Sequence, residues 1–465
     1  MPQQLETDYL IIGTGAMGMA FADVLLSETD ANIIMVDRYH KAGGHWNVAY
    51  PFVTLHQPST FYGVSSKELS KGRIDQTGLN KGLADLASGA EVSAYFDEVM
   101  RHTFLPSGRV RYFPMCEYQG DGQFTSLTTG EQYAVSRRKT VDATWLKTST
   151  PSTHTPKYDI ADDAWFMPPN DLGRLERQPE GYVVIGGGKT GIDTCLWLLE
   201  NRVDPDKIRW IMPRDGWLLD RRNTQTAPEF FEYSLGAQAN QMAAIAASDS
   251  IKDMFDRLEA AGVLLRIDPA VRPKMFHGAT ISQLELEELR RIKNIIRMGR
   301  LQRLEADKLV LEEGEVPTDT NHLHIDCSAR AIENEETCAI FQDDLIVPQT
   351  VRPYQPVFSA AFIAHVEATY GDDEEKKNSI CNVVPLPNHD TDWLKMQTLF
   401  MMNQYNWSRD PEIRAWLYDN RLDGFTQLVQ DVKEDDTDKI AILKRLRENA
   451  MPAMAKLQQY VASLG

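Results

Sequence analysis

The sequence predicts an α/β fold with two Rossmann-type dinucleotide-binding domains, a helical insert and a helical C-terminal region. The prediction rests on a duplicated pattern, in which a buried strand, a glycine-rich turn and a helix follow one another at residues 8–27 and again at residues 181–201. The first glycines of the two turns, Gly13 and Gly186, lie 173 residues apart (186 − 13). Two matches in full strand–turn–helix–strand context indicate two nucleotide-binding units rather than chance glycine-rich turns.

In the first unit, residues 8–12 form an apolar run that leads directly into Gly13, Gly15 and Gly18 of a Gly-x-Gly-x-x-Gly turn. The first glycine permits a tight turn, the second lets the backbone approach a pyrophosphate, and the third allows close helix–strand packing. The helix that follows presents free N–H groups and a positive dipole end to the phosphates. A second apolar run ends at Asp37, whose carboxylate can accept hydrogen bonds from an adenosine ribose.

The second unit repeats this order at Gly186, Gly188 and Gly191. Its second strand is followed by Arg214 and, a few residues later, by Arg221 and Arg222. An arginine at this place pairs with a 2′-phosphate, which favours NADP(H) over NAD(H). The alternative is that Arg214 caps a strand end and the other two arginines are solvated. Asp215, one residue after Arg214, counts against NADP(H).

The remaining patterns divide the chain into regions. Residues 1–150 with about 326–388 are expected to form the first, discontinuous domain, and residues 175–325 the second. Long helices predicted at residues 237–261 and 282–298 make a helical insert of the second domain at about 224–300. Strands are expected at 110–114, at 138–144 after a meander, at 322–329 and at 345–348, with a helix at 356–370. Residues 389–465 have a helical period almost throughout.

Residues 43–66, GGHWNVAYPFVTLHQPSTFYGVSS, alternate glycine, aromatic and polar side chains. They follow the first unit directly, where the chain runs toward the redox-active end of a bound dinucleotide. Trp46, Tyr50 and Phe52 would wall a planar ring, while His56 and Gln57 offer hydrogen bonds to ring heteroatoms or to an oxygen adduct. The alternative is an aromatic-rich loop that packs the domain core.

Composition bounds the kind of protein. The 465 residues suggest about three domains at roughly 150 residues each. A net charge of −18 weighs against a nucleic-acid partner and against a protein held electrostatically on a membrane. The N-terminus has no pattern of a signal peptide and no run of 18 apolar residues occurs, so we expect a cytoplasmic protein. The five cysteines are scattered without Cys-x-x-Cys, which argues against a disulfide framework, a metal site and a disulfide reductase.

The paired fingerprints, the Gly-Gly-x-Trp stretch at Gly44 and Trp46, and the arginine-marked second unit resemble the class B flavoprotein monooxygenases. This group includes the flavin-containing monooxygenases, the N-hydroxylases and the Baeyer–Villiger enzymes. Their Phe-x-Gly-x-x-x-His identifier is absent here, although His154 is present in the corresponding segment. The resemblance implies an FAD site at Gly13, Gly15, Ala16, Met17, Gly18, Asp37, Arg38, Gly44, His45, Trp46 and Gln57. It implies an NADPH site at Gly186, Gly188, Lys189, Thr190, Gly191, Arg214, Arg221 and Arg222.

The function expected from this resemblance is an FAD-dependent, NADPH-consuming monooxygenase, in which a flavin C4a-peroxide formed with molecular oxygen oxygenates a small organic substrate. His56 and Gln57 are the candidate catalytic donors, and Gln349 and Arg352 are weaker candidates. Three alternatives remain open. They are a flavin-dependent halogenase that uses the same peroxide with halide, an NADPH:FAD electron-transfer reductase, and a non-enzymatic nucleotide-binding scaffold.

Overall fold

A computed structural model of the chain describes residues 1–330, 332 and 336–464. Its first sheet has a parallel core in the order β22-β8-β1-β2-β5. The core strands are β1 (Gln3–Ile12), β2 (Ile33–Val36), β5 (Val110–Phe113), β8 (Gln132–Asp142) and β22 (Leu345–Ile346). Antiparallel pairing adds β6 (Cys116–Gly120), β7 (Gln123–Ser126) and β21 (Phe341–Gln342). One sheet therefore combines strands that precede and follow the second nucleotide unit in the sequence.

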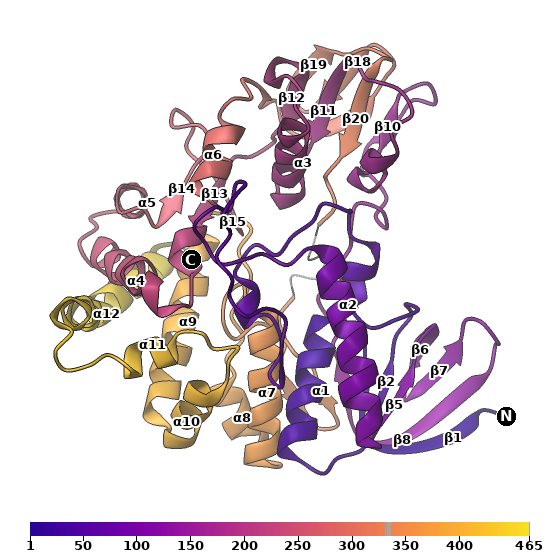
Figure 1. Cartoon of the computed structure of the whole chain (residues 1–465), viewed down its shortest axis with the longest axis vertical. Coiled ribbons are helices and arrows are strands. Elements are labelled where there is room, and N and C mark those ends of the chain that lie inside the picture. Colours follow the sequence, from indigo (N-terminus) through magenta and orange to yellow (C-terminus); the bar gives the residue numbers. More distant parts are fainter. Residues whose placement is uncertain (331, 333–335, 465) are drawn as a thin grey trace.

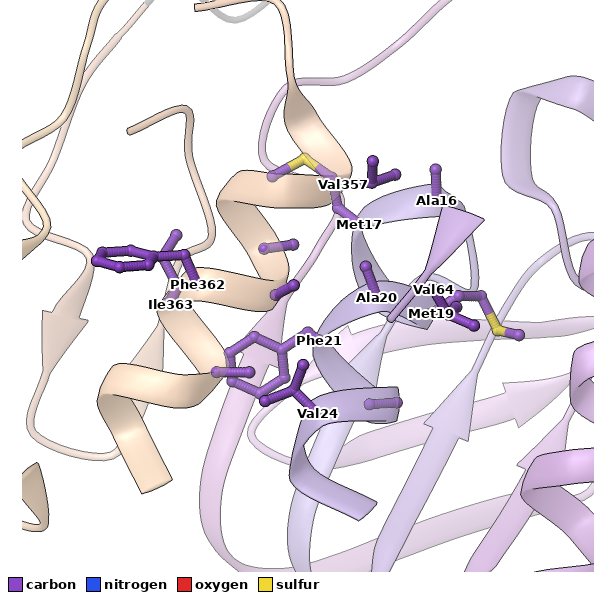
Figure 2. Packing of buried hydrophobic residues seen from close by; sticks show 14 of the residues in the cluster. Ala16, Met17, Met19, Ala20, Phe21, Val24, Val64, Val357, Phe362 and Ile363 are labelled. Carbon is purple, nitrogen blue, oxygen red and sulfur yellow. The ribbon is translucent and has the colours of Figure 1, made fainter. Parts of the chain in front are cut away.

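Helices α1 (Ala16–Glu28) and α7 (Pro356–Tyr370) pack against each other beside this sheet. Figure 2 shows Phe21 and Val24 of α1 facing α7. Both helices are apolar around most of their circumference, as expected for helices buried on more than one side. This region also contains α2 (Gly89–Val99) and α8 (Glu374–Ile380).

The second sheet is entirely parallel, in the order β10-β20-β11-β12-β16. Its strands are β10 (Phe166–Met167), β11 (Gly181–Ile185), β12 (Ile208–Ile211), β16 (Asn294–Ile296) and β20 (His322–Asp326). Helices α3 (Lys189–Glu200) and α6 (Gln283–Leu289) pack together in the same core. A smaller sheet beside it contains β9 (Asp159–Ile160), β17 (Leu301–Leu304), β18 (Lys308–Leu311) and β19 (Gly314–Pro317).

The helix predicted at residues 282–298 is wrong beyond its first two turns. The helix α6 ends at Leu289, and the chain then forms the strand β16, in which Ile295 pairs with Trp210. Apolar residues at positions 286, 289, 292 and 296 have helical spacing. The β-branched pair at 295–296 instead forms the edge strand of a parallel sheet. The strand pairing stabilises this segment more than continuation of the helix would, although the apolar spacing is helical.

The insert also differs from the prediction, because it contributes strands to a small sheet as well as helices. Strands β13 (Gly216–Asp220), β14 (Leu264–Leu265) and β15 (Met275–Ile281) pair in the order β14-β13-β15. The single helix predicted at 237–261 is two helices, α4 (Phe231–Ala246) and α5 (Ile251–Ala260). The break comes at Ser250, whose hydroxyl accepts a hydrogen bond from the Asp253 N–H and so caps the start of α5.

The C-terminal region is helical, as predicted, and consists of α9 (Asp392–Arg409), α10 (Pro411–Asp419), α11 (Thr426–Gln430) and α12 (Thr437–Leu464). The long helix α12 packs on α4 of the insert and on α9. Figure 1 shows the second sheet at one end of the molecule, the first sheet with the N-terminus at the other, and the insert and tail helices along a third side.

Candidate functional site

The first glycine-rich turn has the geometry that the motif demands. Gly13 has a φ of +92°, and a Cβ added at Gly18 would lie 2.0 Å from the Gly13 carbonyl oxygen. The helix α1 begins after Gly15 without a side-chain cap and without an acidic residue in its first turn. Its first residues are Ala16, Met17 and Gly18. This N-terminus therefore offers uncapped N–H groups and no negative charge that would repel a phosphate.

Asp37 follows β2 beside this turn and is 6% exposed. Its Oδ2 accepts hydrogen bonds from the Thr14 N–H (2.5 Å) and hydroxyl (2.8 Å), and its Oδ1 accepts one from the Tyr39 N–H (2.8 Å). The carboxylate is thus fixed next to the turn, with lone pairs left for a ribose. Arg38 points to solvent, 3.7 Å from the Glu117 carboxylate.

The glycine–aromatic stretch begins directly against the first turn. Gly44 has a φ of +55°, and its added Cβ would lie 2.8 Å from the Gly15 Cα. Gly44–Val48 forms a short 3₁₀ helix that contains His45 and Trp46. The Trp46 indole N–H donates to the Tyr62 hydroxyl (2.9 Å), and burial lowers the pKa of His45 to about 4. The wall that this stretch forms is therefore neutral and largely aromatic.

The second turn reproduces the first. Gly186 has a φ of +129°, and a Cβ at Gly191 would lie 2.1 Å from the Gly186 carbonyl oxygen. The helix α3 begins after Gly188, again without a side-chain cap or an acidic residue in the first turn. A serine or aspartate caps α2, α5, α6, α8 and α10, whereas α4, α7, α9 and α11 also lack a side-chain cap, so the glycine-rich turn before it is what distinguishes the start of α3. Lys189 and Thr190 open α3, and Lys189 forms an ion pair with Asp193.

Arg214 lies just beyond the end of β12, where the sequence places a 2′-phosphate ligand. Its Nη2 donates to the Asn388 side-chain oxygen (2.8 Å), and its Nη1 lies 3.3 Å from His389 Nδ1. Asp215, which counted against a phosphate, is only 8% exposed and forms a two-point ion pair with Arg297 (2.8 and 3.0 Å). Its negative charge is thus compensated by Arg297 within the protein.

The two other arginines of the expected basic cluster have different surroundings. Arg221 is 1% exposed, donates to the His56 carbonyl (3.0 Å) and pairs with Glu285 (2.8 Å). Arg222 pairs with Asp220 (2.8 Å). The structure therefore does not bring them together with Arg214, because β13 carries the chain away from the end of β12.

The stretch after the first turn reaches the second unit. The Tyr50 hydroxyl donates to Asp193 (2.7 Å), and the Phe52 ring stacks on Trp197 of α3 at 5.1 Å. His56 lies near Lys189, and its pKa is held well below the usual range by burial and by the positive charges of Lys189 and Arg221. His56 and its neighbour Gln57 thus lie where the two nucleotide units meet. Sequence reasoning missed Asp193, although its i+4 spacing from Lys189 was a usable signal.

The weaker catalytic candidates are engaged with protein groups. Gln349 is 2% exposed and exchanges hydrogen bonds with the backbone of Cys338. Arg352, 8% exposed, pairs with Asp423 (2.6 Å). His154, which remains from the altered family identifier, pairs with Asp326 (2.8 Å) at the end of β20.

Within the described residues, no group of three or more His, Cys, Asp and Glu side chains is arranged to hold a metal ion. No helix in the described part of the chain is both long enough and apolar enough to cross a bilayer. All five cysteines are free.

Two kinds of known protein are similar to this chain. The uncharacterized proteins Rv2000 of Mycobacterium tuberculosis (strain H37Rv) and Mb2023 of Mycobacterium bovis are each 48% identical to it over 425 residues. The match covers 91% of this chain and 79% of each relative. The chain belongs to the family of these mycobacterial proteins. No protein-family model matches it.

Solved structures of cyclohexanone monooxygenase have a similar fold. The ε-caprolactone-bound form, in its loose conformation, has a TM-score of 0.52 at 14% identity, covering 80% of this chain and 89% of that one. The open form has a TM-score of 0.51 at 12% identity, covering 80% and 88%. This likeness confirms the predicted α/β fold with two Rossmann-type domains, which cyclohexanone monooxygenase shares.

Proposed function

We propose that this chain is an FAD-dependent, NADPH-consuming monooxygenase that oxygenates a small organic substrate. The observation that carries the proposal is the pair of uncapped helix N-termini, at α1 and at α3, each behind a Gly-x-Gly turn at the end of a parallel strand. One such helix N-terminus behind a Gly-x-Gly turn would support only a simple nucleotide-binding protein. Two of them, bridged by the stretch from Gly44 to Tyr62, support transfer between two dinucleotides.

The residues around α1 fit FAD. The uncapped N-terminus suits a pyrophosphate, and Asp37 has a fixed carboxylate for a ribose. Gly44 approaches the turn so closely that a side chain there would collide with Gly15. Beyond it, Trp46 and Tyr62 supply an aromatic surface for a planar ring.

The residues around α3 fit NADPH. A Cβ at Gly188 would meet no described atom within 4 Å, so the space before the helix is open. Lys189 is the first residue of this helix and is held there by its ion pair with Asp193. Arg214 provides a guanidinium for the 2′-phosphate, and the Asp215–Arg297 pair removes the nearby repulsion. This favours NADPH over NADH.

When bound, FAD would supply the hydride-accepting and oxygen-activating chemistry that no side chain of this protein provides. The chain's own residues bind and orient the two nucleotides and exclude water between them. His56 is neutral at pH 7, so its ring offers one N–H donor and one acceptor. Together with the Gln57 amide, it supplies hydrogen bonds without a charge at the junction of the two units.

The experiment is to purify the chain, measure its flavin content, and follow NADPH oxidation together with oxygen consumption over a panel of amines, indoles and ketones. We expect bound FAD, bleaching by NADPH without oxygen, and one oxygen molecule consumed per NADPH with product formed. A protein that takes up no FAD on reconstitution would refute the proposal. Electron delivery to an added acceptor without product would support a reductase, and bromide-dependent product would support a halogenase.

A further inference from the structure

A short turn in the C-terminal region lies against the residues assigned above to FAD. This tail turn, residues 420–425, connects α10 to α11. It contacts the hairpin at residues 60–68, which contains β3 (Gly63–Val64) and β4 (Lys67–Glu68), and it contacts the segment before α7. The Phe425 ring also lies edge-on to Phe61 at 6.3 Å. Residues more than 350 positions apart therefore meet at one place.

Arg421 directs its guanidinium at the backbone of this hairpin. Its Nη1 donates to the Thr60 carbonyl (2.6 Å) and its Nε to the Val64 carbonyl (3.0 Å). Its Nη2 lies within hydrogen-bond distance of the carbonyls of Tyr62 (2.8 Å), Val64 (2.5 Å) and Lys67 (2.6 Å). Four carbonyls converge on one side chain, so Arg421 determines the path of the hairpin backbone rather than pairing with a carboxylate.

The hairpin residue Tyr62 in turn holds Trp46, the aromatic side chain expected beside the flavin ring. The Tyr62 hydroxyl accepts the hydrogen bond from the Trp46 indole, and the two rings meet edge to face at 6.1 Å. Trp46 follows Gly44, which contacts Gly15 of the first turn. A continuous set of contacts thus leads from the tail to the Gly-x-Gly turn.

A second link anchors the tail turn itself. Asp423 is 2% exposed and pairs with Arg352 (2.6 Å), whose guanidinium lies 3.6 Å above the Phe358 ring of α7. The other oxygen of Asp423 accepts hydrogen bonds from the N–H groups of Phe425 and Thr426. The turn is therefore anchored on both sides, which fixes the position of the Arg421 backbone.

We propose that Arg421 is a positioning residue for FAD, which acts through the hairpin and Tyr62 to hold Trp46 in place as the wall of the ring site. This inference rests on the proposed function and deepens it. It assigns to the helical tail, which shares no motif with the nucleotide units, a role in shaping the flavin environment.

The test compares Arg421→Met and Tyr62→Phe with the control Arg445→Met. Arg445 is also in the tail, but it donates to Asn240 of α4, away from the hairpin. We expect Arg421→Met to raise the FAD dissociation constant about tenfold and to increase the hydrogen peroxide released per NADPH. Tyr62→Phe should raise the FAD dissociation constant about threefold. Both variants should change the visible circular dichroism of bound FAD, and in the same direction as each other. The control should match the wild type.

A readout without FAD completes the test. Lys67, Lys71 and Arg73 are trypsin sites in or just after the hairpin, and Arg421→Met should make the apoprotein more sensitive there. Wild-type FAD affinity and dichroism in both Arg421→Met and Tyr62→Phe would overturn the inference, even if Arg421→Met lowers the melting temperature. If Arg421→Met does not fold, Tyr62→Phe decides alone. A wild-type protein that binds no FAD would refute the proposed function itself.

Discussion

Gly44 offers a sharp test of the close approach between the aromatic stretch and the first turn. In Gly44→Ala, the new Cβ would lie 2.8 Å from the Gly15 Cα, whereas ordinary contact begins near 3.4 Å. The two backbones must therefore separate by about 0.6 Å (3.4 − 2.8). Since both partners are backbone, no flexible side chain can absorb this movement, and the site for the FAD pyrophosphate is deformed.

Two effects lower the free energy of unfolding of Gly44→Ala. The φ of +55° costs a residue with a Cβ roughly 1–2 kcal/mol, and the steric overlap adds roughly 1–3 kcal/mol. Gly78→Ala is a matched control, because Gly78 has a φ of +74° and an added Cβ there meets no described atom within 4 Å. Gly78→Ala should lose only the roughly 1–2 kcal/mol of stability that the positive φ costs.

The assay is urea unfolding of the apoprotein together with FAD titration by fluorescence. Gly44→Ala should be less stable than Gly78→Ala by about 1–3 kcal/mol and should bind FAD at least about fivefold more weakly, while Gly78→Ala keeps wild-type affinity. Equal FAD affinity in the two variants would show that the approach of Gly44 to Gly15 does not shape the FAD site.

Three further outcomes are expected. Arg214→Gln should raise the KM for NADPH about 10- to 100-fold through loss of a charge-assisted contact and leave that for NADH within about twofold; equal rises would argue against a 2′-phosphate contact. His324 is 1% exposed, and burial lowers its pKa to about 4, so the unfolded chain takes up its proton first as the pH falls. The stability should drop by up to about 3 kcal/mol between roughly pH 6.5 and pH 4, as urea unfolding would show, and a His324→Asn variant with the same slope would contradict this. Glu367→Gln should cost about 3–5 kcal/mol, because Lys139 and Lys377 remain buried without their shared carboxylate; the double variant with Lys377→Met should recover part of the loss, and no recovery would contradict the pairing.

The features that sequence could predict are local ones. Gly13, Gly18, Gly186 and Gly191 are required by contacts within a single turn, so their spacing alone reveals them. The helix predicted at 282–298 failed because its apolar residues fit both a helix and a sheet edge, and only the neighbouring strand β12 decides between them.

The contacts that sequence could not predict depend on distant backbone. Arg221 is a near neighbour of Arg214 in sequence, yet β13 carries it to the His56 carbonyl, 165 positions away. Arg421 binds carbonyl groups of residues 354–361 positions earlier. Because every residue type carries a carbonyl, no pattern of side chains could have marked these partners.

The packing of α1 on α7 also sets the order of events during synthesis. The helix α1 begins at residue 16, but α7, which covers Phe21 and Val24, begins at residue 356 (Figure 2). The ribosome must add 340 more residues (356 − 16), which takes roughly 17–70 s at about 5–20 residues per second. Throughout that interval the apolar face of α1 has no native cover. A fragment that ends before α7 would keep this face exposed permanently, so expression of the first 150 residues alone should yield an aggregating chain rather than an isolated nucleotide-binding domain.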